Sequence, residues 1–439
     1  MPNIVNVIVK QQVASAPSKL QQTGAFVSQG ATTLAAGTYQ LLTQLSDLTT
    51  ILKSANAISS ITWASSVVTV TTTTAHGIPT GDILQGIISG VLVSGSTANA
   101  YNGTYTITST GTYTLTYALA SNPGTATVVA SSTFSLEDTQ ELLAMGTTFF
   151  AQGSTTPVYV LELGVGTPAQ GVTALEAFIT SSTFKFYSYL LPQTWNTEST
   201  AVAMANQYTS TTAQTYFYVT TTLATYTTWA GIKSVLATLQ TPTAPVTEFD
   251  AAAIFWTTLS YNPSASNLAN PLEYSFVYGV TSYSTLTNTQ QTALLAAGVN
   301  YIYTGSQGQI SNTLIEGGTF MDLNTFNYWY AVDWLAINVA ISLSAAIING
   351  SNSSTNPLYY NQAGINALQK VAQATTNNGI AFGLILSPAS VGAIPFNTYV
   401  TQNPSDYAAG IYKGLSLTFV PQRGFSSITI YLTASNIPT

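Results

Sequence analysis

The stretch that decides the fold lies in the last third of the chain. It begins with Leu286–Tyr303 (LTNTQQTALLAAGVNYIY) and continues in Tyr330–Leu343 (YAVDWLAINVAISL). Thr287 and Gln290 have the spacing of a capping box, so we expect a helix that starts there and ends at Gly298. The five residues that follow, VNYIY, predict a strand. After a glycine-rich stretch, the second segment predicts a long helix.

The long helix is defined by apolar residues at helical spacing: Tyr330, Trp334, Ile337, Ile341 and Ile348. Gly350 is expected just past its end. The most apolar part, Ala331–Ile348, is barely long enough to cross a membrane, contains Asp333 and Asn338, and has no Lys or Arg flanks. We therefore interpret it as a buried core helix, in which Asp333 could bond Arg423 or Lys413. A further helix places Ile365, Leu368 and Ala372 together.

Upstream of this region, strands and helices alternate. Expected strands are Val158–Leu163, Phe184–Leu191 and Tyr216–Val219, and expected helices are Leu175–Ile179, Thr200–Tyr208 and Trp229–Leu239. Ser135, with Asp138 three residues later, is expected to cap the helix that precedes them. This order predicts an α/β fold with a mainly parallel sheet covered by helices.

From about Ile58 to Val129 the sequence changes character. Short Thr/Tyr/Val strands such as VVTVTTTT are separated by turns that contain glycine, and Asn102-Gly103 is a strong local turn signal. Helical periodicity is missing here. We interpret the region as an inserted all-β domain at the surface.

Both ends of the chain are strand-like. Ile4–Val9 is almost entirely β-branched, and Ser427–Thr433 alternates apolar and polar residues with period two. Chain ends are usually poorly ordered unless something holds them, so strand-like ends predict pairing with another subunit. The residues expected to form these subunit-linking strands are Val5, Val7, Val9, Ile428, Ile430 and Leu432.

The composition is unusual because only 5% of the 439 residues are charged, while 46% are hydrophobic. Ordinary soluble domains have about 25% charged residues. Neutral polar side chains can be buried between subunits at a lower desolvation cost than charges. The composition therefore favours a protein that packs against copies of itself, although a secreted β-rich protein would also fit.

The charge pattern excludes some classes of partner. Eight basic residues against 15 acidic ones, without a basic cluster, argue against nucleic-acid binding. The absence of cysteine excludes disulfides and thiolate metal sites. Met1–Lys10 has no signal-peptide pattern, so none is expected.

Candidate catalytic and cofactor residues are few. The single histidine, His76, is interpreted as a turn residue rather than a general base. The glycines of the run GVGTPAQG (Gly164, Gly166 and Gly171) follow a strand and precede a helix, but the run lacks the G-K-[ST] ending of a phosphate loop. We expect an ordinary turn here, and neither a cofactor nor a bound metal in the protein.

The acidic pairs Glu137–Asp138 and Glu248–Asp250 are interpreted as carboxylates that favour a helix N-terminus. Clustered ligands at metal-binding spacing are missing from the sequence. A glycoside hydrolase needs only two carboxylates, so this class stays open as a minor alternative.

The order GGTFMDLNTF, YAVDWLAINVAISL and PLYYNQAGINALQKVAQATTNNGIA, together with the capped helix before it, resembles the C-terminal region of phage contractile-tail sheath proteins. It is similar in particular to a sheath-like group known as phage proteins of unknown function. The resemblance covers about Pro271–Ala381 well and the βαβα region more loosely. In the family the helices of this region usually contain many charged residues, whereas in this sequence charged residues are sparse there.

This resemblance implies a non-enzymatic structural subunit of a virion tail, made in the host cytoplasm. It implies hexameric rings stacked helically around a tail tube, with tube and baseplate proteins as partners and with contraction by rigid-body movement. We expect a strand arm and the start of a discontinuous sheath-like core at 1–57, the β module at 58–129, a middle domain at 130–268 and a C-terminal sheath domain at 269–439. The alternative is another self-assembling surface protein, such as a surface-layer protein or adhesin.

Overall fold

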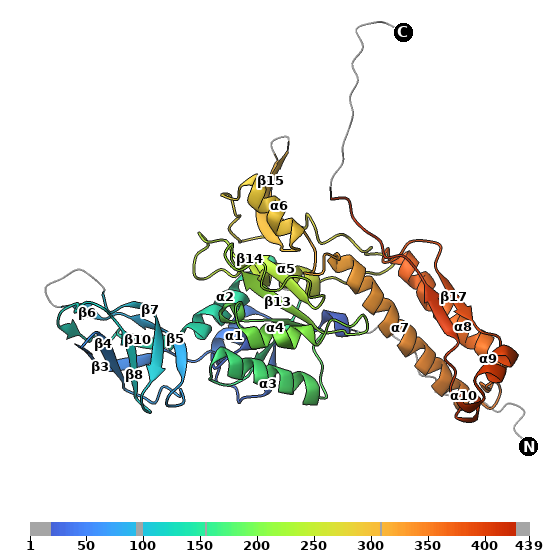
Figure 1. The fold of residues 1–439 in the computed structure, drawn as a ribbon, viewed down its shortest axis with the longest axis horizontal. Helices are drawn as coiled ribbons and strands as arrows, with labels where there is room; N and C mark the ends of the chain where they lie inside the picture. Colours follow the sequence, from blue (N-terminus) through green and yellow to red (C-terminus); the bar gives the residue numbers. More distant parts are fainter. Residues whose placement is uncertain (1–18, 94–99, 154–155, 308–309, 427–439) are drawn as a thin grey trace, which may run out of the picture. The chain divides into compact units, whose positions relative to one another are not determined.

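The computed structural model describes residues 19–93, 100–153, 156–307 and 310–426. The chain forms two compact units (Figure 1). The first, which we name the sheet unit, comprises Leu20–Tyr261 and Leu272–Asn324. The second, which we name the hairpin unit, contains Asn262–Pro271 and the chain from Thr325 onward.

The sheet unit is built on a six-stranded sheet with the order β14-β13-β12-β1-β11-β2. Its strands are β1 (Gly24–Ser28), β2 (Thr38–Leu42), β11 (Val158–Glu162), β12 (Ser188–Leu190), β13 (Tyr216–Thr221) and β14 (Val235–Leu239). All neighbouring pairs are parallel except β2 with β11, which is antiparallel. Five of the strands are buried along almost their whole length, as expected for strands covered on both faces.

Helices cover both faces of this sheet. On one face, Ala25 and Val27 pack against α3 (Pro168–Ser181) and α4 (Ser199–Asn206). On the other face, the ring of Phe26 meets Phe149 and Phe255, which lie on α2 (Glu137–Gln152) and α5 (Asp250–Leu259). Short elements complete this part of the unit: η1 (Leu20–Gln22), α1 (Leu45–Ile51) and η2 (Gln193–Trp195). The predicted α/β class is confirmed.

Two local predictions in this region are wrong. Trp229–Leu239 is not a helix, because it forms turns that lead into β14. A short apolar run that is buried on both faces satisfies helical spacing as well as a strand does, which explains the error. Ser135 does not cap a helix either, because it lies in a strand and α2 begins after Leu136.

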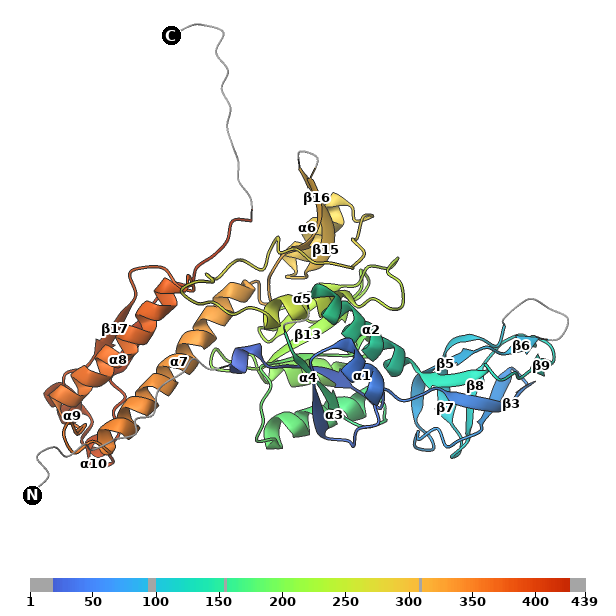
Figure 2. The same cartoon turned by 180° about the vertical axis from the view of Figure 1, so that it is seen from behind.

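The region expected to be all-β forms a closed barrel with the order β10-β3-β4-β8-β7-β5 (Figure 2). Its strands are β3 (Asn56–Ala64), β4 (Val67–Thr72), β5 (Ile83–Ser89), β7 (Gly103–Ser109), β8 (Thr114–Ala118) and β10 (Thr133–Leu136). All its strand pairs are antiparallel, and β6 (Leu92–Val93) pairs separately with β9 (Ala126–Thr127). Because β10 ends at Leu136 and α2 starts at Glu137, the barrel joins α2 without a loop.

The sheet unit also contains a β-hairpin, β15 (Tyr301–Gln307) with β16 (Ile310–Glu316). It follows α6 (Asn288–Ala296), whose N-terminus has the predicted capping box of Thr287 and Gln290. Here the sequence prediction is confirmed, because the capping box is a local signal that needs no tertiary context.

The hairpin unit consists of two long helices with a small sheet against the second. Its elements are α7 (Phe326–Ser351), α8 (Gln362–Ala381), β17 (Ser390–Ala393), α9 (Phe396–Gln402), α10 (Pro404–Ala408) and β18 (Leu415–Thr418). The side chains of Thr325 and Asn361 cap α7 and α8. Gly350 lies in the last turn of α7, not beyond the helix as predicted.

Helix α7 is long and apolar enough to cross a membrane by length and composition, which is weak evidence by itself. Its first half is buried on one side around Trp334 and Leu335, whereas Ile347 and Ile348 near its end are exposed. Only 33% of its most apolar stretch is buried. The prediction of a core helix therefore describes only the first half of α7.

Candidate functional site

The residues predicted to link subunits are Val5, Val7, Val9, Ile428, Ile430 and Leu432, and they lie outside the described residues. What the structure does describe is a small sheet that could accept such strands. β17 and β18 form an antiparallel pair in which Val391 lies opposite Leu417. Among the described residues, neither strand pairs with a third one.

The outer edge of β17 is covered by side chains from α8. Val391 donates its backbone N–H to Gln373 Oε1 at 2.9 Å, and its carbonyl accepts from Gln369 Nε2 at 2.7 Å. A second bond from Gln373 Nε2 reaches the carbonyl of Ala389 at 3.1 Å. These contacts occupy the backbone groups that a further strand would need on this side.

The outer edge of β18 is open among the described residues. Ile394 donates its N–H to the carbonyl of Gly414, which fixes the alternation of hydrogen-bonded pairs along the two strands. The backbone groups of Leu415 and Leu417 consequently point away from β17. β18 is therefore the edge of this sheet that can receive a strand from another chain.

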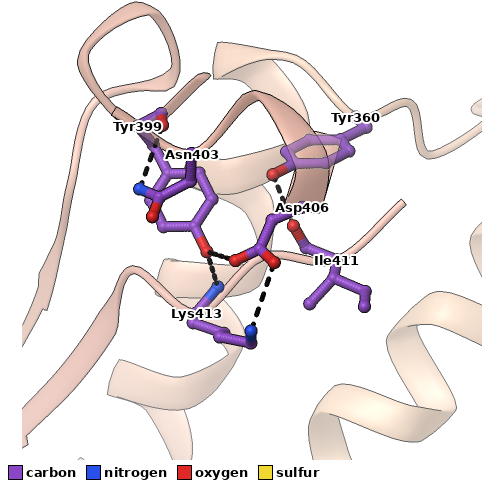
Figure 3. A network of polar contacts seen from close by, with 6 residues as sticks. All are labelled: Tyr360, Tyr399, Asn403, Asp406, Ile411 and Lys413. Atoms are coloured by element: carbon purple, nitrogen blue, oxygen red, sulfur yellow. Dashed lines mark hydrogen bonds and ion pairs between the residues drawn. The ribbon is translucent and has the colours of Figure 1, made fainter. Parts of the chain in front are cut away.

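A polar network holds the chain that leads into β18 (Figure 3). Tyr399 on α9 donates its hydroxyl hydrogen to Asp406 Oδ2 at 2.8 Å and accepts the backbone N–H of Lys413 at 2.9 Å. Lys413 Nζ forms an ion pair with Asp406 Oδ1 at 3.2 Å. The hydrogen bond from Tyr399, and then that from Lys413, lower the pKa of Asp406 below its ordinary value.

The same network shows which carboxylate Lys413 pairs with, a point that the sequence left open. The ion-pair partner of Lys413 is Asp406, so the suggested bond between Lys413 and Asp333 is wrong. Asp333 itself is buried on α7. Near the network, Tyr360 Oη donates to the carbonyl of Ile411 at 2.7 Å, which fixes the same stretch of chain from a second side.

In the sheet unit, β1 and β11 are neighbouring parallel strands, and their carboxyl ends lie at the edge where parallel sheets commonly bind ligands. The chain that follows β1 leads to α2 on one face of the sheet. The chain that follows β11 contains the glycine-rich run and leads to α3 on the other face. The side chain of Glu162 is buried at this edge. Its Oε1 accepts the N–H groups of Gly30 and Gly164 at 2.7 Å each, and its Oε2 accepts from the hydroxyls of Ser28 and Thr32 at 2.7 Å.

Internal contacts hold part of the glycine-rich run. Gln29 Nε2 donates to the carbonyl of Gly166 at 2.6 Å, and Trp195 Nε1 donates to Gln29 Oε1 at 2.9 Å. A Cβ atom at Gly171 would meet Trp195 and Gln29 at 2.6–2.7 Å. The run forms the turn between β11 and α3.

An acidic cluster lies where the barrel meets α2. Glu137 and Asp138 are in the first turn of α2, as expected, and Glu141 follows one turn later. Burial, with the charges of Glu137 and Glu162, raises the pKa of Asp138 to about 7. Burial and the charge of Asp138 raise the pKa of Glu141 to about 8, against the opposing effect of the N–H that Gln193 donates to it at 2.5 Å.

Beside this cluster is an open pocket of about 290 Å³. It is lined by residues of the barrel and of the sheet, among them Gln29, Gln85, Thr106, Asp138, Gly166 and Thr194. In the described part of the chain, no three His, Asp or Glu side chains are grouped so that they could hold a metal ion.

The remaining candidate residues have structural roles. His76 is buried in the barrel, where its Nδ1 accepts the N–H of Ile78 at 3.2 Å and its Nε2 lies 3.3 Å from the carbonyl of Thr114. Asp250 begins α5 and accepts the N–H of Thr241 at 2.7 Å. Burial raises the pKa of Asp250, and the nearby Glu248 adds to this.

The fold has counterparts among solved structures. The helical sheath of the anti-feeding prophage in its contracted state is similar with a TM-score of 0.52 and 11% identity, covering 99% of this chain and 100% of that chain. A chain of the contracted anti-feeding prophage baseplate is similar with a TM-score of 0.53 and 12% identity. The match covers 99% of this chain and 98% of that chain. The sheath tail protein Lin1278 from Listeria innocua gives a TM-score of 0.43 and 10% identity, covering 93% and 96%.

No protein-family model matches the sequence, and no curated protein matches it. The two structures with TM-scores above 0.5 match over nearly the whole chain. This protein has the fold of contractile sheath proteins. The resemblance noted in the last third of the sequence is thereby confirmed for the fold, and it extends to both units.

Proposed function

We propose that this protein is the structural subunit of a contractile phage tail sheath. The observation that carries the proposal is a structural match with a contractile sheath over 99% of this chain and all of the other. Glu162 accepts hydrogen bonds from the backbone around it, which supports a structural role for this residue.

Subunits are linked by strand exchange. The open edge of β18 accepts a terminal strand of a neighbouring subunit, Ile4–Val9 or Ser427–Thr433. Each backbone hydrogen bond contributes roughly 0.5–1.5 kcal/mol net, so a strand of a few residues gives a durable connection. A link of this kind joins different surfaces of two subunits and therefore propagates into rings or helices.

The assembly consists of hexameric rings stacked around a tail tube, with the tube and the baseplate as partners. The subunit belongs to the virion tail and assembles in the host cytoplasm. During contraction the subunits move as rigid bodies, and the exchanged strands keep them connected while other contacts change. The low charge supports this, since neutral polar surfaces can part and re-form contacts without breaking buried ion pairs.

The barrel is an inserted domain on the outer surface of the sheath, separate from the discontinuous core. Its hydrophobic cluster, from Ile58 to Leu136, is distinct from the cluster of the sheet. Within Asn56–Leu136 the only Asp, Glu, Lys or Arg is Asp82, so this surface relies on neutral hydroxyl groups.

Electron microscopy of the purified protein tests the proposal. Tubes or stacked rings support a sheath, whereas flat two-dimensional arrays would favour a surface-layer protein. A monodisperse monomer with activity on a polysaccharide would instead favour a glycoside hydrolase.

A further inference from the structure

A row of aromatic side chains lies exposed on the sheet unit. Phe276 and Tyr278 are 55% and 60% exposed, and Tyr274 is also exposed, while Val277 between them is buried. This alternation is that of a strand, and the segment pairs with β16 through a bridge between Phe276 and Leu314. Phe276 and Tyr278, two residues apart, therefore lie on the same side of this segment, and Tyr274 lies in the turn just before it.

The register adds further groups to this side. Leu314 lies opposite both Phe276 and Tyr303, so Tyr303, which is half-buried against the core of the sheet, lies on the same side. Glu316 is near Tyr274 and Tyr303, and one of its carboxylate oxygens is buried without a hydrogen-bond partner among the described residues. We name the surface formed by Tyr274, Phe276, Tyr278, Tyr303, Glu273 and Glu316 the aromatic–acidic face.

The backbone of this face is strained at one position. Tyr274 has φ of 65°, a left-handed conformation that is a genuine outlier for a bulky residue. Gly318, with φ of 64°, leaves the space that the backbone of Glu273 occupies, because a Cβ there would lie 2.6 Å from the Glu273 nitrogen. Strain of this kind persists where the surrounding structure imposes it, commonly at binding surfaces.

We propose that the aromatic–acidic face binds the segment Val420–Phe425 of a second copy of this chain. Arg423 of that copy lies over the rings and near the two carboxylates, and Phe425 packs against Phe276, with Tyr278 at the edge of the contact. The inference deepens the proposed function, on which it rests, by assigning a contact between subunits that is separate from strand exchange.

The occupant follows from complementarity. Phe425 is 82% exposed, an unusual state for a large apolar side chain, and Val420 is exposed beside it. Arg423 is the only arginine of the chain and is exposed as well. Guanidinium groups stack on aromatic rings and pair with carboxylates, so an Arg-Gly-Phe sequence matches a surface of rings and acids.

The segment is also presented firmly. Leu386 donates its N–H to the carbonyl of Val420 at 2.8 Å, and Gln422 donates to the carbonyl of Leu384 at 2.9 Å. These bonds fix the backbone immediately before Arg423. A fixed backbone loses less entropy when the exposed side chains dock on a partner.

Because the chain contains no cysteine, introduced cysteines test the contact without background. One preparation carries Tyr278→Cys and a differently tagged one carries Ser426→Cys, both of which keep Phe276, Arg423 and Phe425. The two are mixed, allowed to assemble and treated with a short bismaleimide. A covalent dimer containing both tags is expected. The matched control replaces Tyr278→Cys by Tyr113→Cys, at an exposed tyrosine of the barrel, and should give no more than trace product.

Charge substitutions sharpen the test. Arg423→Glu in the Ser426→Cys chain should lower the yield of mixed dimer about tenfold, and Glu273→Arg in the Tyr278→Cys chain should restore it. Lys370→Glu makes the same charge change at an exposed lysine of α8 and should leave the yield unchanged.

A cross-linking yield equal to that of the Tyr113 control would overturn the inference. So would a loss of mixed dimer with Arg423→Glu that Glu273→Arg does not reverse. Tubes without the cross-link would refute this contact and leave the sheath proposal standing. Cross-linked small oligomers without tubes would support this contact and contradict the sheath proposal.

Discussion

The backbone amide of Val391 donates a hydrogen bond to Gln373 Oε1 at 2.9 Å, and this contact closes one edge of the β17–β18 sheet. A two-stranded sheet has two edges, and an exposed edge is a template for any free strand. Because α8 side chains cover the β17 edge, the β18 edge is the one that remains, among the described residues, for the strand addition that we propose.

Leu417→Pro tests the open edge. Leu417 directs its N–H away from β17, so proline there removes a donor to the added strand and no donor to β17. We expect tubes to be abolished while the thermal unfolding midpoint stays within a few degrees of the wild type. Ser416→Pro is the contrast, since the N–H of Ser416 points toward β17 and its loss should destabilise the hairpin unit itself. Normal tubes from soluble Leu417→Pro protein would refute β18 as the acceptor.

Ile430→Pro tests the donor side of the same link. Ile430 lies outside the described residues, in the terminal stretch whose alternation predicts a strand. Proline would remove one ladder donor, so the subunit should fold normally, as judged by circular dichroism, but should not grow into tubes. Tubes indistinguishable from those of the wild type would show that the terminus does not link subunits.

Removing the buried carboxylate of Glu162 should destabilise the sheet unit. In Glu162→Gln, an amide nitrogen would face donors such as the N–H groups of Gly30 and Gly164, so at least one buried donor would lose its partner. A loss of about 2–4 kcal/mol in the free energy of unfolding is expected, measured by urea denaturation. Glu198→Gln, at an exposed helix cap, is the control and should cost less than about 1 kcal/mol. Equal effects at the two positions would contradict this role of Glu162.

The raised pKa values predict that stability falls as pH rises. Asp138 and Glu141 have pKa values of about 7 and about 8 in the folded protein, against ordinary values of 3.8 and 4.5. Between these limits the folded state binds more protons than the unfolded state, so the stabilisation is fully present below about pH 4 and is lost as pH rises to about 8. Thermal unfolding between pH 4.5 and 8.5 measures this.

The double variant Asp138→Asn, Glu141→Gln supplies the comparison for the pH dependence. Neutral amides at both positions should flatten the decline of the unfolding midpoint above pH 6. A double variant with the same pH profile as the wild type would show that other groups, such as Asp250, cause the decline.

Deleting the barrel tests its status as an insert. Replacing residues 56–135 by a short Gly/Ser linker joins the chain before β3 to the start of α2. We expect soluble protein that still forms tubes, with density missing from their outer surface. If soluble deletion protein forms no tubes, the barrel belongs to the assembling core.

How much could be predicted from the sequence depended on the range of the interactions. The capping box of Thr287 and Gln290 needs only four residues of local sequence, and it was predicted correctly. The error at Trp229–Leu239 arose because burial on both faces removes the period-two signal of a strand. Ser135 failed as a cap because pairing across the barrel, which closes it, outweighed the local signal.

The candidate site was less accessible to sequence reasoning. The closing of the β17 edge depends on Gln369 and Gln373, which lie about twenty residues from their partners and look like ordinary polar residues of a helix. Glu162 did leave a signal, a single carboxylate at the end of the apolar strand VYVLE. A charge there demands internal partners once the strand is buried, so such a residue can be recognised as structural in advance.

Cryo-electron microscopy of the purified wild-type protein tests the central claim most directly. The account predicts hollow tubes or stacked rings in which a strand from one subunit lies against Leu415–Thr418 of the next. A protein that stays a monodisperse monomer under all assembly conditions, or tubes in which the β18 edge is empty, would contradict it.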